Sequence, residues 1–241
     1  MRVKAVLSYD GSKFYGFQYQ KHTDETVANT LQKALNSLNI NSKIVASGRT
    51  DKGVHATNQV IHFDLPPFWR NLEKLKNSLN RIVLPYIYIK NIHFVEKNFH
   101  ARFSAKRRAY RYILSSKEPS PFEYSYVTFI KDIDFNKIKE SIKIFERRYD
   151  FKYFQKSGSE VLTTIRTIYK ARFYEYRDYK ILYFEADGFL RSQIRMMVDF
   201  LLKIAKDSLT KEDLKEQLLC KKRYSTSLAL PNGLYLCRVI Y

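Results

Sequence analysis

The sequence has few cysteines and no long apolar run. Its two cysteines, Cys220 and Cys237, are too few and too far apart to form a zinc site. The most apolar stretch, MMVDFLLKIA, is interrupted by Asp199 and Lys203 and is too short to span a membrane. The first ten residues, MRVKAVLSYD, lack the apolar core of a signal peptide. We therefore expect a cytoplasmic protein with reduced cysteines and no membrane partner.

Acidic residues are scarce relative to basic ones. Lys and Arg number 43 and Asp and Glu number 24, which gives a formal net charge of +19. Such an excess is typical of proteins that bind nucleic acids, because cations pair with backbone phosphates. The 19 tyrosines and 17 phenylalanines could also stack on bases, although core and sheet packing accounts for most of them. A generally basic proteome is the alternative explanation of the charge.

The chain has no sequence repeat and no low-complexity linker, but the order of its predicted elements repeats. Hydrophobic periodicity predicts a β-α-β-β-α-β order in the first half, at 3–9, 26–38, 43–47, 57–65, 71–83 and 86–95. The second half repeats this order with an extra helix, at 107–114, 134–145, 165–176, 180–187, 189–205, 211–219 and 233–241. We expect an α/β (α+β) fold of two ferredoxin-like or RRM-like halves, 1–104 and 105–241, with antiparallel sheets and a basic cleft between them.

The densest group of chemically active residues lies in ASGRTDKGVHA, residues 46–56. Gly48 and Gly53 can adopt a positive φ and allow the backbone to approach a ligand closely. Arg49 near Asp51 favours the ionised carboxylate, which suits a nucleophile or an electrostatic anchor and is a poor general acid. Taken alone, TDKG is also an ordinary hairpin turn, so these residue types leave both interpretations open.

The whole stretch resembles the signature G-R-T-D-x-G-V-H of the TruA family of tRNA pseudouridine synthases. Four further segments are similar to blocks of that family in the same order: YDGSKFYGFQ (9–18), FHARFSAKRRAYRYIL (99–114), FLRSQIRMMV (189–198) and GLYLCRVIY (233–241). Five ordered blocks are far more specific than any one of them.

Some residues of the second half depart from the family pattern. These are Arg191, Ser192 and Gln193, then Asp199 and Ala205 in place of helix glycines, and the loose motif LALPNG (228–233). They lie around the predicted cleft, so they concern the breadth of substrates rather than the reaction.

The resemblance implies isomerisation of uridine to pseudouridine at positions 38, 39 and 40 in the anticodon stem-loop of tRNA, without a cofactor or a metal. Asp51 matches the nucleophile, which adds either to C6 of uracil or to C1′ of the ribose. Arg195 matches an arginine that pairs with Asp51 across the cleft. Tyr110 matches a tyrosine that stacks on uracil and assists proton removal at C5. The resemblance also implies a homodimer in which one tRNA spans both subunits.

Arg49 and His55 have several interpretations. Arg49 could contact a phosphate, hold open the space left by an extruded base, or form a salt bridge with Asp51. For His55 we favour structural hydrogen bonding, then RNA contact, then acid–base chemistry.

Four basic runs are candidates for contacts to the RNA backbone: KRR (106–108), ERR (146–148), YRDYK (176–180) and CKKR (220–223). Each one singly is typical of a solvated surface. Together they predict RNA binding that weakens steeply with salt.

Two other classes of function compete with the enzyme. A non-catalytic RRM-like RNA-binding or RNA-folding protein would keep the basic surface without needing Asp51. An RNA hydrolase using Asp51 and His55 is disfavoured, because no second acidic residue lies near this loop. The three classes differ in product: isomerised uridine, unchanged RNA or cut RNA.

Overall fold

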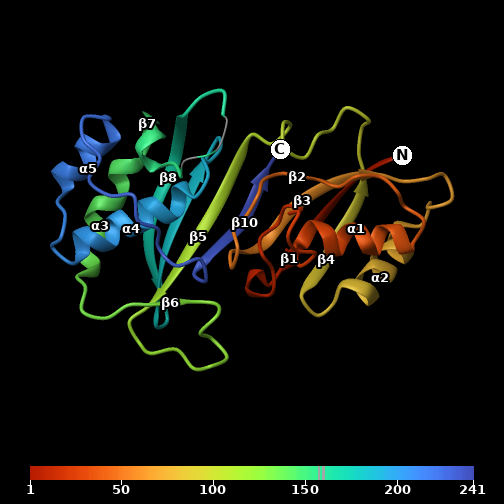
Figure 1. The fold of residues 1–241 in the computed structure, drawn as a ribbon, viewed down its shortest axis with the longest axis horizontal. Coiled ribbons are helices and arrows are strands. Elements are labelled where there is room, and N and C mark those ends of the chain that lie inside the picture. Colours follow the sequence, from red (N-terminus) through yellow and green to blue (C-terminus); the bar gives the residue numbers. More distant parts are fainter. Residues whose placement is uncertain (157, 159–160) are drawn as a thin grey trace. The chain divides into compact units, whose positions relative to one another are not determined.

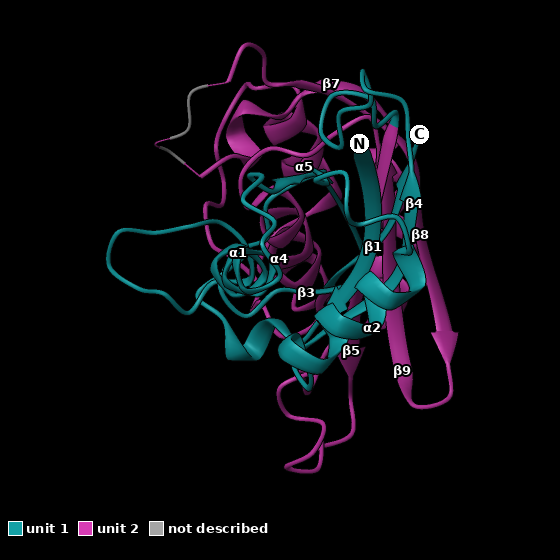
Figure 2. Ribbon diagram, turned by 90° about the vertical axis from the view of Figure 1, so that its right-hand side faces the viewer, with its two compact units in different colours: residues 1–106, 235–241 teal, residues 107–234 magenta. Residues whose placement is uncertain are grey.

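Two compact units make up the chain in the computed structural model, which describes residues 1–156, 158 and 161–241 (Figures 1 and 2). Unit 1 contains residues 1–106 and 235–241, and unit 2 contains residues 107–234. The last strand thus groups with unit 1, whereas the sequence halves placed it with the second. Parallel pairing of Tyr235 with His55 accounts for this grouping.

Unit 1 has the predicted β-α-β-β-α-β order, which confirms the ferredoxin-like pattern for this part of the chain. Its elements are β1 (Arg2–Tyr9), the 3-10 helix η1 (Gly11–Lys13), α1 (Val27–Ser37), β2 (Val45–Ala46), β3 (His55–Asp64), α2 (Leu72–Val83), β4 (Ile87–Phe94) and β10 (Leu234–Ile240). In the sheet, β1 lies between β4 and β3 and is antiparallel to both. On β3, β2 pairs antiparallel and β10 pairs parallel.

The elements of unit 1 follow from their patterns of apolar residues. Residues of β1 alternate between buried and partly exposed positions, as expected for a strand with one face on a core. The helices α1 and α2 each bury one apolar face and begin at a capping side chain, Thr26 and Asn71 respectively. Figure 1 shows both helices beside the sheet.

Unit 2 is also a helix-covered, mainly antiparallel sheet. Its elements are β5 (Arg107–Ser115), β6 (Thr128–Phe129), α3 (Phe135–Ser141), η2 (Ile142–Phe145), β7 (Arg147–Asp150), η3 (Phe151–Phe154), β8 (Ile165–Tyr176), β9 (Tyr179–Ala186), α4 (Gln193–Ala205) and α5 (Lys211–Leu218). The antiparallel order is β5-β9-β8-β7, and β6 runs parallel to β5. Fully buried aromatic rings dominate the core: Tyr112, Phe145, Phe151, Phe154, Phe184 and Phe200.

Unit 2 differs from its sequence prediction in three details. The strands β6 and β7 were not predicted, because two and four residues are too few to show a period. The helix predicted over 134–145 changes to 3-10 geometry at Ile142. The helix predicted from 189 begins at Gln193, because Ser192 has a left-handed φ of 58°. The predicted capping box of Thr210 and Asp213 is confirmed.

None of the helices in the described part of the chain is both long and apolar enough to cross a membrane. Within the same residues, no three His, Cys, Asp or Glu side chains are grouped so that they could hold a metal ion.

Candidate active site

Asp51 lies in a tight turn of unit 1, between β2 and β3. The amide N–H of Val54 donates to the carbonyl of Asp51 at 3.1 Å, and Gly53 has a φ of 78°. Glycine therefore supplies the positive φ that this turn requires. The Asp51 side chain is partly exposed, between an exposed Lys52 and a buried Thr50, so the turn presents the carboxylate at the surface of unit 1.

A second glycine supports the backbone of Asp51. Gly16 has a φ of 102°, and a Cβ atom there would lie only 2.9 Å from the Thr50 carbonyl oxygen and 3.3 Å from the Asp51 carbonyl carbon. The amide N–H of Phe17 donates to the same Thr50 carbonyl at 3.0 Å. The segment 9–18 therefore packs directly against the turn, and only glycine fits at its point of closest approach.

Buried polar side chains hold the chain on both sides of Arg49. Gln59 is fully buried; its Oε1 accepts from the Ser47 hydroxyl at 2.7 Å, and its Nε2 donates to the Gly48 carbonyl at 2.9 Å. On the other side, the hydroxyls of Tyr9 and Thr50 lie 2.8 Å apart. These hydrogen bonds fix the backbone that carries Arg49 and Asp51.

Gln59 and Tyr9 were not predicted to support the site, although the sequence contains a signal for Gln59. Gln59 lies two residues before Ile61 and four before Phe63, on the side of β3 that the strand period assigns to the core. A polar residue at such a position has to find hydrogen-bond partners, which marks it as part of a buried network.

His55 is buried within unit 1, with 2% of its surface exposed. The amide N–H of Gly11 donates to its Nδ1 at 3.0 Å, and the ring stacks on Tyr235 with centroids 4.7 Å apart. Its Nδ1 also lies 3.3 Å from Asp10 Oδ1. This environment favours structural hydrogen bonding over contact with RNA.

Unit 2 carries the two tyrosines of YRY on β5. Tyr110 is 8% exposed and meets the edge of the Phe189 ring, with centroids 5.3 Å apart. Tyr112 is fully buried; its hydroxyl donates to the Leu230 carbonyl at 2.7 Å and lies 2.8 Å from the Thr128 hydroxyl. Burial raises the pKa of Tyr112, so this phenol stays protonated and serves packing.

Arg195 is partly exposed near the start of α4, and the loop before β10 orients it. Its Nε donates to the Ala229 carbonyl at 2.7 Å, and the amide N–H of Ala229 donates back to the Arg195 carbonyl at 3.1 Å. Gly233 anchors the end of this loop, where a Cβ atom would lie 2.6 Å from the Ile113 carbonyl oxygen.

Asp199, one of the departures from the family pattern, binds the same loop to α4. Its Oδ2 lies 3.1 Å from Lys203 Nζ and accepts from the Ser225 hydroxyl at 3.2 Å. Lys203 Nζ also donates to Ser225 at 2.7 Å and to Ser227 at 2.9 Å. This carboxylate therefore supports the loop that orients Arg195.

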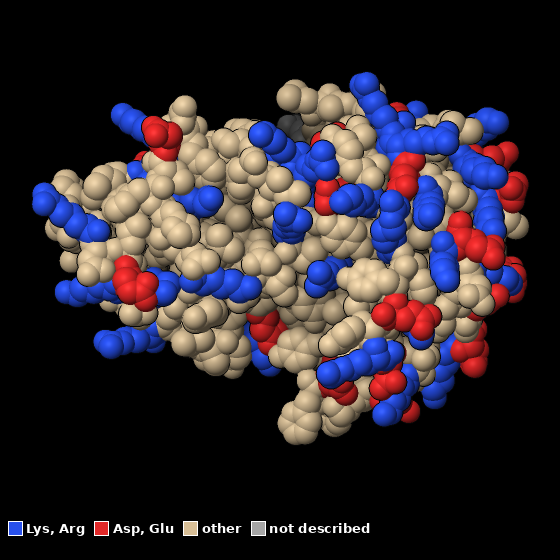
Figure 3. Space-filling view, turned by 180° about the vertical axis from the view of Figure 1, so that it is seen from behind, with Lys and Arg blue, Asp and Glu red and all other residues tan. Residues whose placement is uncertain are grey.

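The predicted site residues are divided between the units. Unit 1 contains Arg49, Asp51 and His55, and unit 2 contains Tyr110 and Arg195. Cations are plentiful on the surface: Figure 3 shows Lys and Arg side chains across one face of the molecule, with fewer acidic side chains among them.

Comparison with known proteins assigns this chain to a family. A family described as tRNA pseudouridine synthase matches residues 5–104 and 142–241, which include Asp51 and Arg195 but not Tyr110. The chain is 44% identical to tRNA pseudouridine synthase A of Campylobacter jejuni, over all of both chains. It is 43% identical to the enzyme of the same name from Wolinella succinogenes, over 98% of this chain and 93% of that one.

One solved structure of a different protein shows a much weaker similarity. A chain from the crystal structure of a Cbf5-Nop10-Gar1 complex aligns with a TM-score of 0.35 and 14% identity, over 83% of this chain and 45% of that one.

Because the tRNA pseudouridine synthases match over nearly the whole chain, this protein is an RNA-modifying isomerase. The chain belongs to the tRNA pseudouridine synthase family, whose reaction converts uridine to pseudouridine in tRNA. The resemblance inferred from the five sequence blocks is thereby confirmed.

Proposed function

We propose that Asp51 is the nucleophile of this reaction. The observation that carries the proposal is the contrast around the turn: Asp51 is partly exposed, while close packing of Gly16 and the hydrogen bonds of buried Gln59 position the backbone of the turn. A carboxylate held in this way meets a substrate without a large loss of conformational freedom.

The reaction is an isomerisation, so no atom is gained or lost. The N1–C1′ bond of uridine breaks, the uracil turns, and a C5–C1′ bond forms. The hydrogen on C5 leaves as a proton, and N1 ends with a proton of its own. Asp51 adds to C6 of the uracil or to C1′ of the ribose and is released at the end, as a nucleophilic catalyst must be.

Three other residues have proposed roles in this step. Arg195, whose Nε donates to the Ala229 carbonyl, pairs with the Asp51 carboxylate and holds it in line, the role that the family motif gives this arginine. Tyr110 stacks on the target uracil, and its hydroxyl assists removal of the C5 proton. Arg49, exposed at the edge of the turn, contacts a phosphate beside the extruded nucleotide.

We further propose that the enzyme modifies positions 38, 39 and 40 in the anticodon stem-loop and acts as a homodimer. Both statements are supported by the five motif blocks, which are distributed along the chain from residue 9 to residue 241. A single subunit has to grip the body of the tRNA and also reach the anticodon arm, and a second subunit would divide these tasks.

The experiment uses bulk tRNA that lacks this modification, with pseudouridine located by chemical labelling and primer-extension stops. We expect stops at positions 38 to 40 only. Stops elsewhere in the tRNA would overturn the positional assignment. Light scattering of the same preparation is expected to give twice the 28.7 kDa of one chain, and a value for a single chain would exclude the dimer.

A further inference from the structure

A basic cavity of about 490 Å³ lies within unit 2, formed by η3, α4 and the loop after α5. Its lining includes Lys152, Lys156, Met196, Arg223 and Thr226. Three of these are cations, and no Asp or Glu is among the described residues that line it. The family motifs do not include these cations; only Arg223 was noted, in the basic run CKKR.

Buried hydrogen bonds build the walls of this cavity. Gln217 is fully buried on α5, and its Nε2 donates to the carbonyls of Tyr153 at 3.2 Å and Ser225 at 3.0 Å. Its Oε1 accepts hydrogen bonds from the backbone N–H groups of Tyr224 at 2.7 Å and Ser225 at 3.0 Å. One side chain thus joins η3 to the loop that carries Arg223, so the cavity is formed before any ligand arrives.

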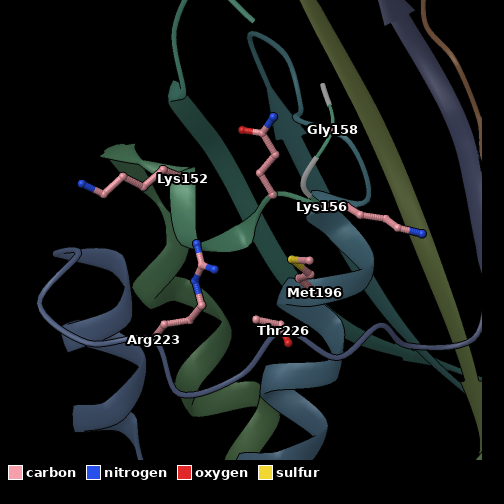
Figure 4. A pocket seen from close by; sticks show the side chains of 7 residues that line it. Lys152, Lys156, Gly158, Met196, Arg223 and Thr226 are labelled. Atoms are coloured by element: carbon pink, nitrogen blue, oxygen red, sulfur yellow. The ribbon is translucent and has the colours of Figure 1, made fainter. Parts of the chain in front are cut away.

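Two of the three cations lie beside one aromatic ring. The Arg223 guanidinium lies 4.6 Å from the centre of the Tyr153 ring, and Lys152 Nζ lies 5.5 Å from it. Asp150 Oδ2 is 3.9 Å from Lys152 Nζ, a distance that leaves the ammonium able to bind a second anion. In Figure 4, Arg223 reaches up toward η3, and Lys152 and Lys156 point in opposite directions on either side of it.

We propose that this cavity binds the phosphodiester backbone of the RNA substrate. Lys152 and Lys156 extend to opposite sides of the cavity in Figure 4 and do not converge on one point, so the arrangement suits successive phosphates of one strand better than a single anion. Planar guanidinium groups pair well with phosphate oxygens, and lysine ammonium groups add charge without fixing direction. Because backbone contacts read no bases, the cavity contributes affinity and register rather than sequence preference.

The position of the cavity indicates which part of the RNA it holds. Met196 follows Arg195 directly on α4, and Thr226 belongs to the loop whose Ala229 accepts the Arg195 hydrogen bond. The bound phosphates therefore belong to the anticodon arm, near the target uridine. This placement rests on the proposed role of Arg195 and on the proposed anticodon-arm substrate.

The test compares a Lys152→Ala/Arg223→Ala variant with a control that removes the same amount of charge, Lys131→Ala/Lys139→Ala. Both control residues are exposed lysines of unit 2 that lie outside the cavity and outside the four basic runs. The affinity for tRNA is measured by filter binding across a range of salt concentrations. We expect the cavity variant to bind about tenfold more weakly and its salt slope to be shallower by roughly one to two, with little change in the control.

A charge-preserving variant, Lys152→Arg/Arg223→Lys, separates phosphate binding from folding. It keeps both cations and is expected to retain the wild-type salt slope, even if the loss of Arg223 from the Tyr153 ring lowers the melting temperature. For the alanine variant, KM should rise while kcat at saturating tRNA stays near the wild-type value. An isolated anticodon-arm hairpin should reproduce the defect in affinity.

Equal affinities and equal slopes for the cavity variant and its control would overturn the proposal. A defect with whole tRNA that is absent with the hairpin would refute the placement beside the target uridine. Failure of the proposed function would give a separate result: wild-type protein would leave positions 38 to 40 unmodified, whatever the binding data show.

Discussion

The hydroxyl of Tyr9 lies 2.8 Å from the hydroxyl of Thr50, the residue that precedes Asp51. The two residues are 41 positions apart in the chain and both are buried, so the last residue of β1 directly supports the turn with the proposed nucleophile. The neighbouring Gln59 side chain holds Ser47 and Gly48 at the start of the same turn. The position of this turn thus depends on buried side chains of the neighbouring strands β1 and β3.

Removing the Tyr9 hydroxyl should slow the reaction without weakening tRNA binding. In Tyr9→Phe, Thr50 loses its buried partner, at a cost of about 1 kcal/mol, which corresponds to a rate roughly fivefold lower if the whole cost falls on the transition state. Single-turnover pseudouridine formation measures the rate, with Tyr19→Phe, at an exposed position, as the control. A raised KM with an unchanged rate would contradict a positioning role.

Gly16→Ala should destabilise unit 1 and misplace Asp51 together. The new methyl group would lie 2.9 Å from the Thr50 oxygen at a φ that alanine rarely adopts, so we expect a loss of about 1–3 kcal/mol. Urea unfolding measures this loss. Gly188→Ala is the matched control, since a Cβ there would meet only the Arg166 side chain, at 3.6 Å or more. Equal urea midpoints for Gly16→Ala and Gly188→Ala would contradict the close approach of the backbone at Gly16.

His62 should make the stability of unit 1 depend on pH in the acid range. Burial, and after it the charges of Arg2 and His100, lower the pKa of His62 to about 4. The unfolded chain then binds a proton below about pH 6.5 that the folded chain excludes until about pH 4, so stability is complete above this window and is lost as the pH falls through it. The loss is on the order of 3 kcal/mol.

The free energy of unfolding between pH 4 and 7 tests this linkage. His62→Gln should flatten the pH dependence, because glutamine takes up no proton and can still accept the bond that the Ala101 N–H makes to Nδ1. His93→Gln, at an exposed position of β4, should behave like the wild type. If the free energy of unfolding fell with pH in the same way for all three proteins, His62 would not be the cause of the acid destabilisation.

Much of the fold was predictable because its helices and main strands carry clear periods. The β-α-β-β-α-β order of unit 1 follows from apolar spacing alone. Short strands carry no period, so β6 and β7 were missed. The grouping of the last strand with unit 1 was also missed, since it depends on the pairing of Tyr235 with His55 far away in the chain.

The proximity of candidate site residues could be predicted from the sequence only where they are local. Arg49, Asp51 and His55 share one short motif, so the sequence brings them together. The support from Gly16 and Tyr9 comes through tertiary contacts with Thr50, which no local pattern records. Asp199 was predicted to affect substrate breadth, but its contacts with Lys203 and Ser225 give it a structural role in the loop near Arg195.

The most direct test of the account replaces Asp51 with asparagine, which keeps the shape of the side chain and removes its negative charge. Pseudouridine in the anticodon arm is measured with excess enzyme under single-turnover conditions, and tRNA binding is measured in parallel. Lys52→Ala, one residue further along the same turn, is the control. We predict that Asp51→Asn binds tRNA like the wild type and forms no pseudouridine, while Lys52→Ala remains active. Pseudouridine formation by Asp51→Asn at a rate near that of the wild type would contradict the assignment of Asp51 as the nucleophile.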